Sequence, residues 1–261
     1  MTEDTPALCP ESHQESPRFL YIERAGWVAL GTGLALAFVP FFMPRIRWIL
    51  SYFATLVHEI GHSAAAWVFG YPSIPAFDFR YGGGVAVTEL EASTWVLVVL
   101  GIAFLAFLAN NYRDRAILTL SLLGLACYLV LRITSLHRLL ILYLGHGTEL
   151  LFAVLFIYRA ASNWAVHHGV ERLLYAVIGF YLAFANVAFC RSLLIDEGYR
   201  AIYFDGKAEG MPNDFYRIWV VHAGAASFER VVVVHLVLTL LCPLAALLLH
   251  YLISRNTQDR A

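Results

Sequence analysis

Long apolar stretches bounded by charged residues dominate the chain. They cover residues 25–43, 47–69, 94–109, 116–133, 139–158, 173–195 and 229–253. A helix of about 20 apolar residues is long enough to cross a hydrocarbon layer of ~30 Å. The stretch at 94–109 is short, and residues 215–227 are compatible with a half-helix. The pattern therefore predicts six to eight transmembrane helices.

The segment between the second and third stretches has a different pattern. In residues 74–91, apolar and polar positions roughly alternate around Gly82, Gly83 and Gly84. Alternation about a glycine turn is typical of a β-hairpin. We therefore expect a small membrane-associated β-hairpin here, with an ordinary connecting loop as the alternative.

Composition places the whole chain in the membrane class. Hydrophobic residues make up 60% of the chain and charged residues 14%. In soluble domains about a quarter of all residues are charged. We expect an all-α polytopic membrane protein with a single membrane domain over residues 25–253, a disordered polar tail over 1–24 and a polar tail over 254–261. The first 24 residues lack the basic start of a signal peptide, so the first span is expected to be an uncleaved anchor.

Charge and cysteine content narrow the possible partners. The net charge of -1 gives no indication of nucleic-acid binding, and the lipid bilayer is the expected surrounding, most simply in the cell membrane. The four cysteines are widely spaced and fit neither a disulfide framework nor a Cys-x-x-Cys metal site. Lysine and arginine residues are nearly equally divided between the connecting segments on the two membrane faces, so the orientation of the chain in the membrane stays open.

The loop at 196–216 is expected on the membrane face that receives the hairpin.

The second apolar stretch contains His58-Glu59-Ile60-Gly61-His62. Two histidines four apart lie on one face of a helix and are able to hold one Zn²⁺, while the adjacent glutamate is placed to activate water. If the helix starts near Ile46, His58 lies about 18 Å along its axis, below the surface of the hydrocarbon layer. Ionisable groups at that depth indicate a functional site. A chance match, with the histidines bonding to neighbouring helices, is the alternative.

This motif and the segment after it resemble the site-2 protease family of intramembrane zinc metallopeptidases, in particular its compact branch without a PDZ domain. The likeness rests on HEIGH, a small apolar run ending at Gly70 and the GGGV of the hairpin, and it covers residues 46–90. It implies that His58 and His62 are zinc ligands, that Glu59 is the general base and that transmembrane segments of membrane-anchored proteins are the substrates. Residues Gly83, Gly84 and Val85 would then position the substrate by strand addition.

The resemblance implies a distant aspartate as the third ligand. The chain departs from the family here, because it lacks an Asn-Pro-x-x-Asp-Gly element: Asn186 has no following proline, and Asp205-Gly206 lies in a polar loop. The compact branch places an aspartate just before a late helix, and Gly210 to Asp214 is similar. Asp214 is therefore the expected ligand. Alternatively, Asn213 or Asp214 only caps the helix that follows.

His146 and Glu149, three apart on one face of the fifth apolar stretch, are the rival candidates. Glu149 is an alternative third ligand, as in membrane-embedded prenyl-protein proteases. Both residues are also expected in a supporting role, orienting a ligand histidine or relaying protons. A simple pair or a bond to a neighbouring helix remains a further possibility. His222, Glu229 and His235 are expected to be structural.

Together these features predict a zinc-dependent intramembrane endopeptidase. A different class of function stays open: a non-enzymatic membrane protein that keeps the site for a metal ion or protons, or an inactive binder of transmembrane partners. The absence of a proline-containing aspartate motif supports this second account. Substrate identity, the trigger of cleavage and the oligomeric state do not follow from the sequence.

Overall fold

The computed structural model describes residues 19–78, 83–206, 211–222, 224 and 226–258. It is mostly helical and contains one small sheet, which confirms the predicted fold class. The elements are η1 (Phe19–Tyr21), α1 (Arg24–Leu36), α2 (Val39–Phe42), α3 (Pro44–Val68), β1 (Ser73–Asp78), β2 (Gly83–Thr88), α4 (Thr94–Asn111), α5 (Arg115–Ile133), α6 (Leu136–Ser162), α7 (Gly169–Ile195), α8 (Glu197–Asp205), α9 (Asp214–His222) and α10 (Phe228–Gln258).

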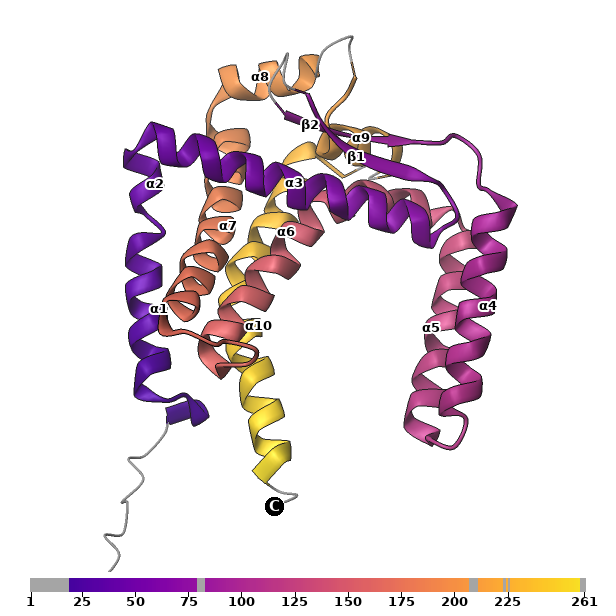
Figure 1. Cartoon of the computed structure of the whole chain (residues 1–261). Coiled ribbons are helices and arrows are strands. Elements are labelled where there is room, and N and C mark those ends of the chain that lie inside the picture. Colours follow the sequence, from indigo (N-terminus) through magenta and orange to yellow (C-terminus); the bar gives the residue numbers. More distant parts are fainter. Residues whose placement is uncertain (1–18, 79–82, 207–210, 223, 225, 259–261) are drawn as a thin grey trace, which may run out of the picture.

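Six helical segments of the described chain are long and apolar enough to cross a membrane. They are Arg24–Phe42, which joins α1 and α2, and the helices α4, α5, α6, α7 and α10. This number lies at the lower end of the predicted range and indicates a multi-pass membrane protein. The helices run broadly up and down in the view of Figure 1, with α6 strongly tilted.

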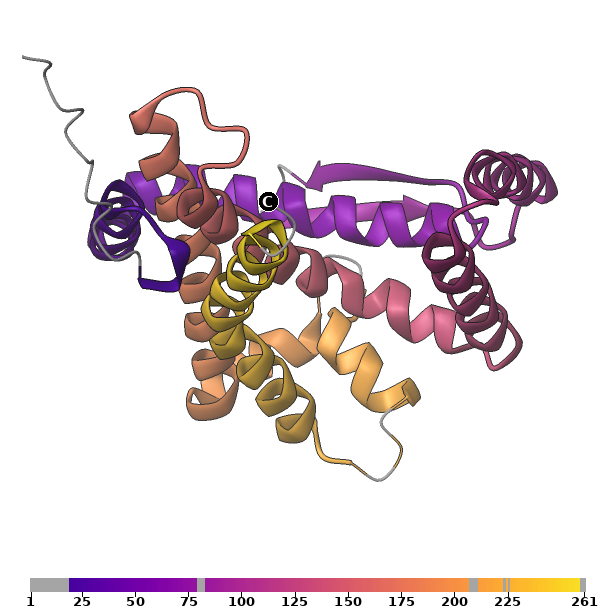
Figure 2. The ribbon, with the colours of Figure 1, turned by 90° about the horizontal axis from the view of Figure 1, so that it is seen from below.

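The helix that carries the HEIGH motif, α3, differs from the sequence-based expectation. It has 25 residues but is not among the six candidate spans. It crosses the ends of the neighbouring helices in Figure 1, and Figure 2 shows it lengthwise from below. Its two histidines and glutamate, together with several hydroxyl side chains, lower its average hydropathy. Distance along α3 is therefore not a measure of depth in a membrane, and the predicted transmembrane course of 47–69 is corrected.

The segments expected to form the two tails are partly built into the fold. Residues 1–18 and 259–261 lie outside the described residues. Ile22, inside the expected N-terminal tail, is only 2% exposed, and the ring of Tyr21 stacks on Tyr251 with 5.7 Å between centroids. The expected C-terminal tail begins inside α10, which continues to Gln258.

Small residues allow the helices of the main body to pack closely. A side-chain Cβ at Gly33 of α1 would overlap Ala176 of α7, and one at Gly179 of α7 would meet Ile157 of α6 at 2.9 Å. Such close approach is the usual basis of helix association in membranes. Helices α4 and α5, in contrast, have no buried side chain among their described residues and stand apart from this body in Figure 1. An all-round apolar surface of this kind matches a lipid surrounding.

The predicted hairpin is confirmed. Strands β1 and β2 pair antiparallel from Ser73↔Thr88 to Asp78↔Gly83, and residues 79–82 between them lie outside the described residues. The hairpin packs along α3 (Figure 1). Helices α8 and α9 lie at the same end of the molecule, as expected for the loop at 196–216. The motif helix, the hairpin and α9 therefore meet at one end of the bundle.

Candidate metal centre

The centre forms where α3 crosses α6, and two glycines make this crossing possible. A Cβ at Gly61 of α3 would overlap the backbone oxygen of Leu144 on α6. A Cβ at Gly145 of α6 would overlap the Nε2 atoms of both His58 and His62. The backbone of α6 thus lies so close to the two imidazoles that only glycine, which has no side-chain carbon, fits at position 145. No local sequence pattern marks Gly145 as a site residue.

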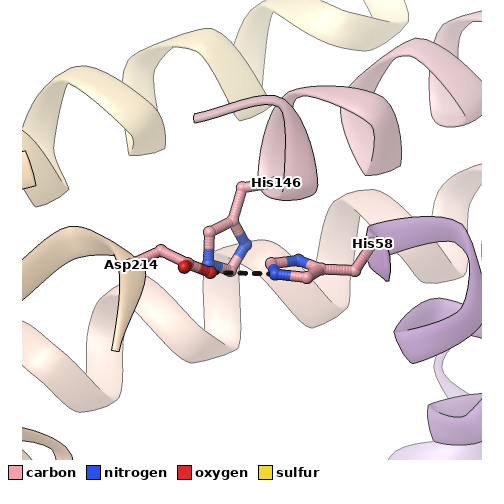
Figure 3. A group of neighbouring side chains, drawn as sticks. All are labelled: His58, His146 and Asp214. Atoms are coloured by element: carbon pink, nitrogen blue, oxygen red, sulfur yellow. Dashed lines mark hydrogen bonds and ion pairs between the residues drawn. The ribbon is translucent and has the colours of Figure 1, made fainter. Parts of the chain in front are cut away.

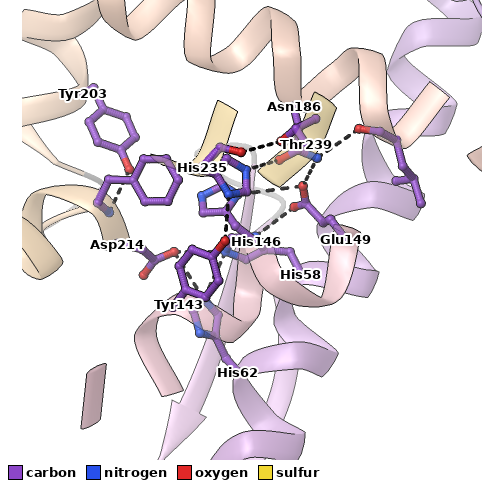
Figure 4. Close-up of polar contacts among 12 residues, drawn as sticks. His58, His62, Tyr143, His146, Glu149, Asn186, Tyr203, Asp214, His235 and Thr239 are labelled. Atoms are coloured by element: carbon purple, nitrogen blue, oxygen red, sulfur yellow. Dashed lines mark hydrogen bonds and ion pairs between the residues drawn. The ribbon is translucent and has the colours of Figure 1, made fainter. Parts of the chain in front are cut away.

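Three polar atoms from distant parts of the chain converge beside this crossing. The Nε2 atoms of His58 and His62 lie 3.0 Å apart, and Asp214 Oδ2 lies 3.0 Å from the first and 3.2 Å from the second. Asp214 comes from the first turn of α9, opposite the motif helix (Figures 3 and 4). The expected partner of the motif histidines is therefore at the expected place. Its role as a ligand stays a prediction.

The opposite nitrogens of the two imidazoles bind acceptors. His58 Nδ1 lies 2.9 Å from Glu149 Oε1, and His62 Nδ1 lies 2.7 Å from the carbonyl oxygen of Ile141. A carboxylate and a carbonyl only accept, so each Nδ1 donates, and a neutral imidazole then presents a lone pair at Nε2. Metal-bound histidines in proteins almost always have this arrangement.

Three acceptor atoms therefore face one another at about 3 Å. Such atoms repel unless a positive charge, either a proton or a metal ion, lies between them. Ligands 2.0–2.1 Å from a tetrahedral zinc ion lie about 3.3–3.4 Å apart, close to the 3.0–3.2 Å found here. Two imidazoles and one carboxylate are also a ligand set that catalytic zinc sites use. The space above Gly145 and the chemistry of these donors fit such an ion.

Asp214 is held as an ion by its surroundings, not used as a helix cap. Burial alone would raise the pKa of its carboxyl, but the contacts with the imidazoles of His58 and His62 lower that pKa well below its usual range. The first turn of α9 has another partner, because the backbone N–H of Phe215 donates to the hydroxyl of Tyr203 at 3.2 Å. Asn213 donates its amide to the carbonyl of Tyr203 at 2.8 Å. The capping alternative for Asp214 thus finds no support in the described contacts.

Glu149 lies on the far side of His58 from Asp214. It contacts Nδ1, so it does not converge on the point that the Nε2 atoms share. Its second oxygen accepts from Asn186 Nδ2 at 2.6 Å, and Asn186 Oδ1 accepts from His235 Nε2 at 2.8 Å (Figure 4). The position of Glu149 therefore matches the expected role of orienting His58 better than the alternative role of third metal ligand. Sequence reasoning missed Asn186 as a site residue, although a buried amide in an apolar helix was a usable signal.

His146 lies on the same turn of α6 as Gly145. One ligand atom each from His58, His146 and Asp214 lies within 4.8 Å of the other two (Figure 3). The Nδ1 atom of His146 lies 3.8 Å from Glu149 Oε2, too far for a hydrogen bond. His146 is therefore a further possible metal ligand beside the centre.

Glu59 faces a cavity next to the centre. The cavity has a volume of about 610 Å³, and its lining includes Glu59, His58, His146 and Asp214. Glu59 is 3% exposed, and a Cβ at Gly84 of β2 would meet its Oε1 at 2.5 Å. The hairpin backbone thus packs directly on the glutamate. Gly83 also lines the cavity, whereas Val85, two positions after Gly83, is half-buried and is not part of the lining.

His222 and Glu229 have no described contact with the proposed ligands. His222 ends α9 and Glu229 lies in the first turn of α10, so they do not share a helix. Glu229 pairs with Arg200 at 3.3 Å on the surface.

Comparisons of the chain with protein-family models, with curated proteins and with solved structures find no match.

Proposed function

We propose that this chain is a zinc-dependent intramembrane endopeptidase that cleaves transmembrane segments of membrane-anchored proteins, in the cell membrane. The main support is the convergence of Asp214 with the two motif imidazoles, from which it is separated by 152 and 156 positions. The resemblance of residues 46–90 to the site-2 protease family agrees with this assignment. Six apolar helices supply the membrane setting.

His58, His62 and Asp214 would hold the ion. Zinc bound there would polarise a peptide carbonyl and lower the pKa of water towards neutrality. Glu149 and the carbonyl of Ile141 orient the two imidazoles from behind. The three side chains belong to two separate helices, α3 and α9, so the centre forms only in the folded chain.

Glu59 is the proposed general base. Its carboxylate would accept a proton from the attacking water and pass it to the leaving amine. The glutamate is next to His58 in the chain and lines the same cavity as Asp214. Contact with the backbone at Gly84 restricts its side chain, which favours one productive orientation.

The hairpin is the proposed support for the substrate. A helical segment must unwind before one of its peptide bonds is attacked, and its released N–H and C=O groups then need partners. The described sheet has two strands, so each strand has an outer edge that no further described strand occupies. Strand addition at such an edge would bind the unwound segment beside Glu59.

A reconstituted cleavage assay tests this proposal. Purified protein would be placed in liposomes with a panel of single-span reporters tagged at both ends, and new termini would be identified by mass spectrometry. We expect fragments cut within the apolar span with the wild type, and none with Glu59→Gln, which should still bind one zinc ion. Cleavage by Glu59→Gln at the wild-type rate would remove the general-base assignment, and protein without zinc would remove the metal assignment.

A non-enzymatic metal site is the second candidate. The observation that favours it is His146, which places one more donor beside the three proposed ligands. Zinc sites with four protein ligands are generally structural, whereas catalytic sites keep one position open. Stoichiometric zinc without cleavage of any reporter would support this candidate.

A further inference from the structure

The imidazole of His146 has a surrounding that its hydrogen bonds do not explain. It is 9% exposed, and its Nδ1 is buried without a hydrogen-bond partner in the described part of the chain. Buried polar groups are nearly always hydrogen-bonded, so a buried imidazole nitrogen without a partner calls for a physical reason.

Aromatic rings hold this imidazole beside the centre. Its centroid lies 4.4 Å from the ring of His58, 4.5 Å from Phe215 and 5.0 Å from Phe189. Edge and face contacts of this kind fix the ring without using its nitrogens. Its Nδ1 side faces Glu149 Oε2 at 3.8 Å, so the carboxylate that orients His58 also attracts a proton on His146 Nδ1. The Nε2 lone pair is then free to bind a cation.

The position of His146 relative to the cavity distinguishes it from His62. His58, His146 and Asp214 all line the cavity together with Glu59, whereas His62 is not part of the lining. An ion held by His58, His62 and Asp214 would lie beside this cavity, whose lining also includes Glu59. His146 therefore lies on the side from which water and substrate would arrive.

We propose that His146 is a fourth protein ligand that closes the metal site at rest and must withdraw before hydrolysis. This inference rests on the proposed zinc function. One ligand atom of His146 lies within 4.8 Å of one from His58 and one from Asp214, which places the imidazole beside the proposed ion. A fourth protein ligand would leave no position for water, whereas hydrolysis needs one open position. Arrival of a substrate in the cavity would displace His146 and open the fourth position.

Cobalt-substituted protein in detergent provides the test. The visible absorption of Co²⁺ reports its ligands, and added imidazole or azide reports an open position. We expect His146→Ala to bind zinc at least tenfold more weakly than the wild type and to show a cobalt spectrum that added imidazole returns to the wild-type form. His146→Phe keeps a ring among Phe189 and Phe215 and fills the space, so it should lose affinity equally without responding to imidazole.

His250→Ala is the matched control. His250 is 5% exposed and also has a buried nitrogen, Nε2, without a hydrogen-bond partner in the described chain, but it does not belong to the group of possible ligands. It should leave zinc affinity and the cobalt spectrum unchanged. Wild-type affinity and spectra in both His146 variants would overturn the proposal. Azide binding by wild-type cobalt protein as tight as that by His146→Ala would do the same.

The proposed function fails in a different way. If the wild type binds neither zinc nor cobalt, the metal centre itself is wrong. If the wild type binds metal and cleaves reporters, and the His146 variants have its zinc affinity and its cobalt spectrum, only the assignment of the fourth ligand is wrong.

Discussion

Glu149 and His58 are joined by a hydrogen bond of 2.9 Å between Oε1 and Nδ1, across 91 positions of the chain. This contact sets the direction of the His58 lone pair. With Nδ1 donating to the carboxylate, Nε2 faces His62 and Asp214. The roles of the two nearby acids therefore follow from which nitrogen each one contacts.

Removal of Asp214 should weaken zinc binding more than removal of Glu149. Asp214→Ala deletes a proposed ligand and should abolish stoichiometric zinc at micromolar concentrations. Glu149→Ala deletes the partner of Nδ1 and should weaken affinity by about 10- to 100-fold while leaving one ion bound at saturation. Competition with a fluorescent zinc chelator measures both values. The reverse order of effects would move the third ligand to Glu149.

The close approach of α6 makes Gly145 a sensitive position. In Gly145→Ala the added methyl group would occupy space 2.6 Å from His58 Nε2 and overlap His62, so zinc binding should fall by at least tenfold. Gly147→Ala, two residues further on the same helix, meets only the side chains of Leu144 and Tyr143, at 3.1 Å or more. It should retain wild-type zinc content. Equal zinc content in the two variants would show that the approach at Gly145 does not limit the centre.

Much of this arrangement could be predicted from local sequence. Apolar length predicted the spans, and the spacing of His58 and His62 placed both imidazoles on one helix face. The alternation around the glycines predicted the hairpin. These are properties of short segments, which the sequence displays directly. Asp214 was reached through a resemblance, because no local pattern distinguishes a ligand from a helix cap.

The remainder depended on contacts between distant segments. The course of α3 across the ends of the neighbouring helices depends on contacts with them, whereas the apolar length of residues 47–69 predicted a span that is not among the six candidates. Gly145 matters only because α3 crosses at that point, and Asn186 only because Glu149 and His235 lie on either side of it. A single sequence contains no measure of those distances.

The outer edge of β2 is tested by a backbone change at Ala86. Ala86 is paired with Pro75, and the hydrogen bond from the N–H of Glu89 to the carbonyl of Pro72, three pairs away, sets the antiparallel alternation so that the N–H of Ala86 points away from β1. Ala86→Pro removes this outward N–H and should lower reporter cleavage by at least tenfold, because strand addition depends on main-chain hydrogen bonds. Ala86→Ser keeps the N–H and should cleave normally. Zinc content should stay at one equivalent in both variants; unchanged cleavage by the proline variant would discard strand addition.

Metal removal should lower the stability of the folded chain. Free zinc at 100 times its dissociation constant stabilises a folded state by about 2.7 kcal/mol if it binds only that state. Chelation should therefore lower the unfolding temperature in detergent, and adding zinc back should restore it. Glu59→Gln should respond as the wild type does, because Glu59 is not a proposed ligand. His58→Ala should respond to neither treatment, and a full response from this variant would place the bound zinc elsewhere.

Asn186 links Glu149 to the last helix and should affect the centre from a distance. Its amide donates to Glu149 Oε2 at 2.6 Å and accepts from His235 Nε2 at 2.8 Å, and its side chain is buried. Asn186→Leu keeps a similar volume but leaves an oxygen of Glu149 and the N–H of His235 unpaired, each at a cost of about 1–3 kcal/mol. We expect Asn186→Leu to have a lower unfolding temperature than the wild type, and a zinc affinity between that of the wild type and that of Glu149→Ala.

The double variant Asn186→Leu with Glu149→Ala should bind zinc no more weakly than Glu149→Ala alone, because Asn186 acts on the ion only through that carboxylate. Additive losses in the double variant would show that Asn186 influences the centre by another route.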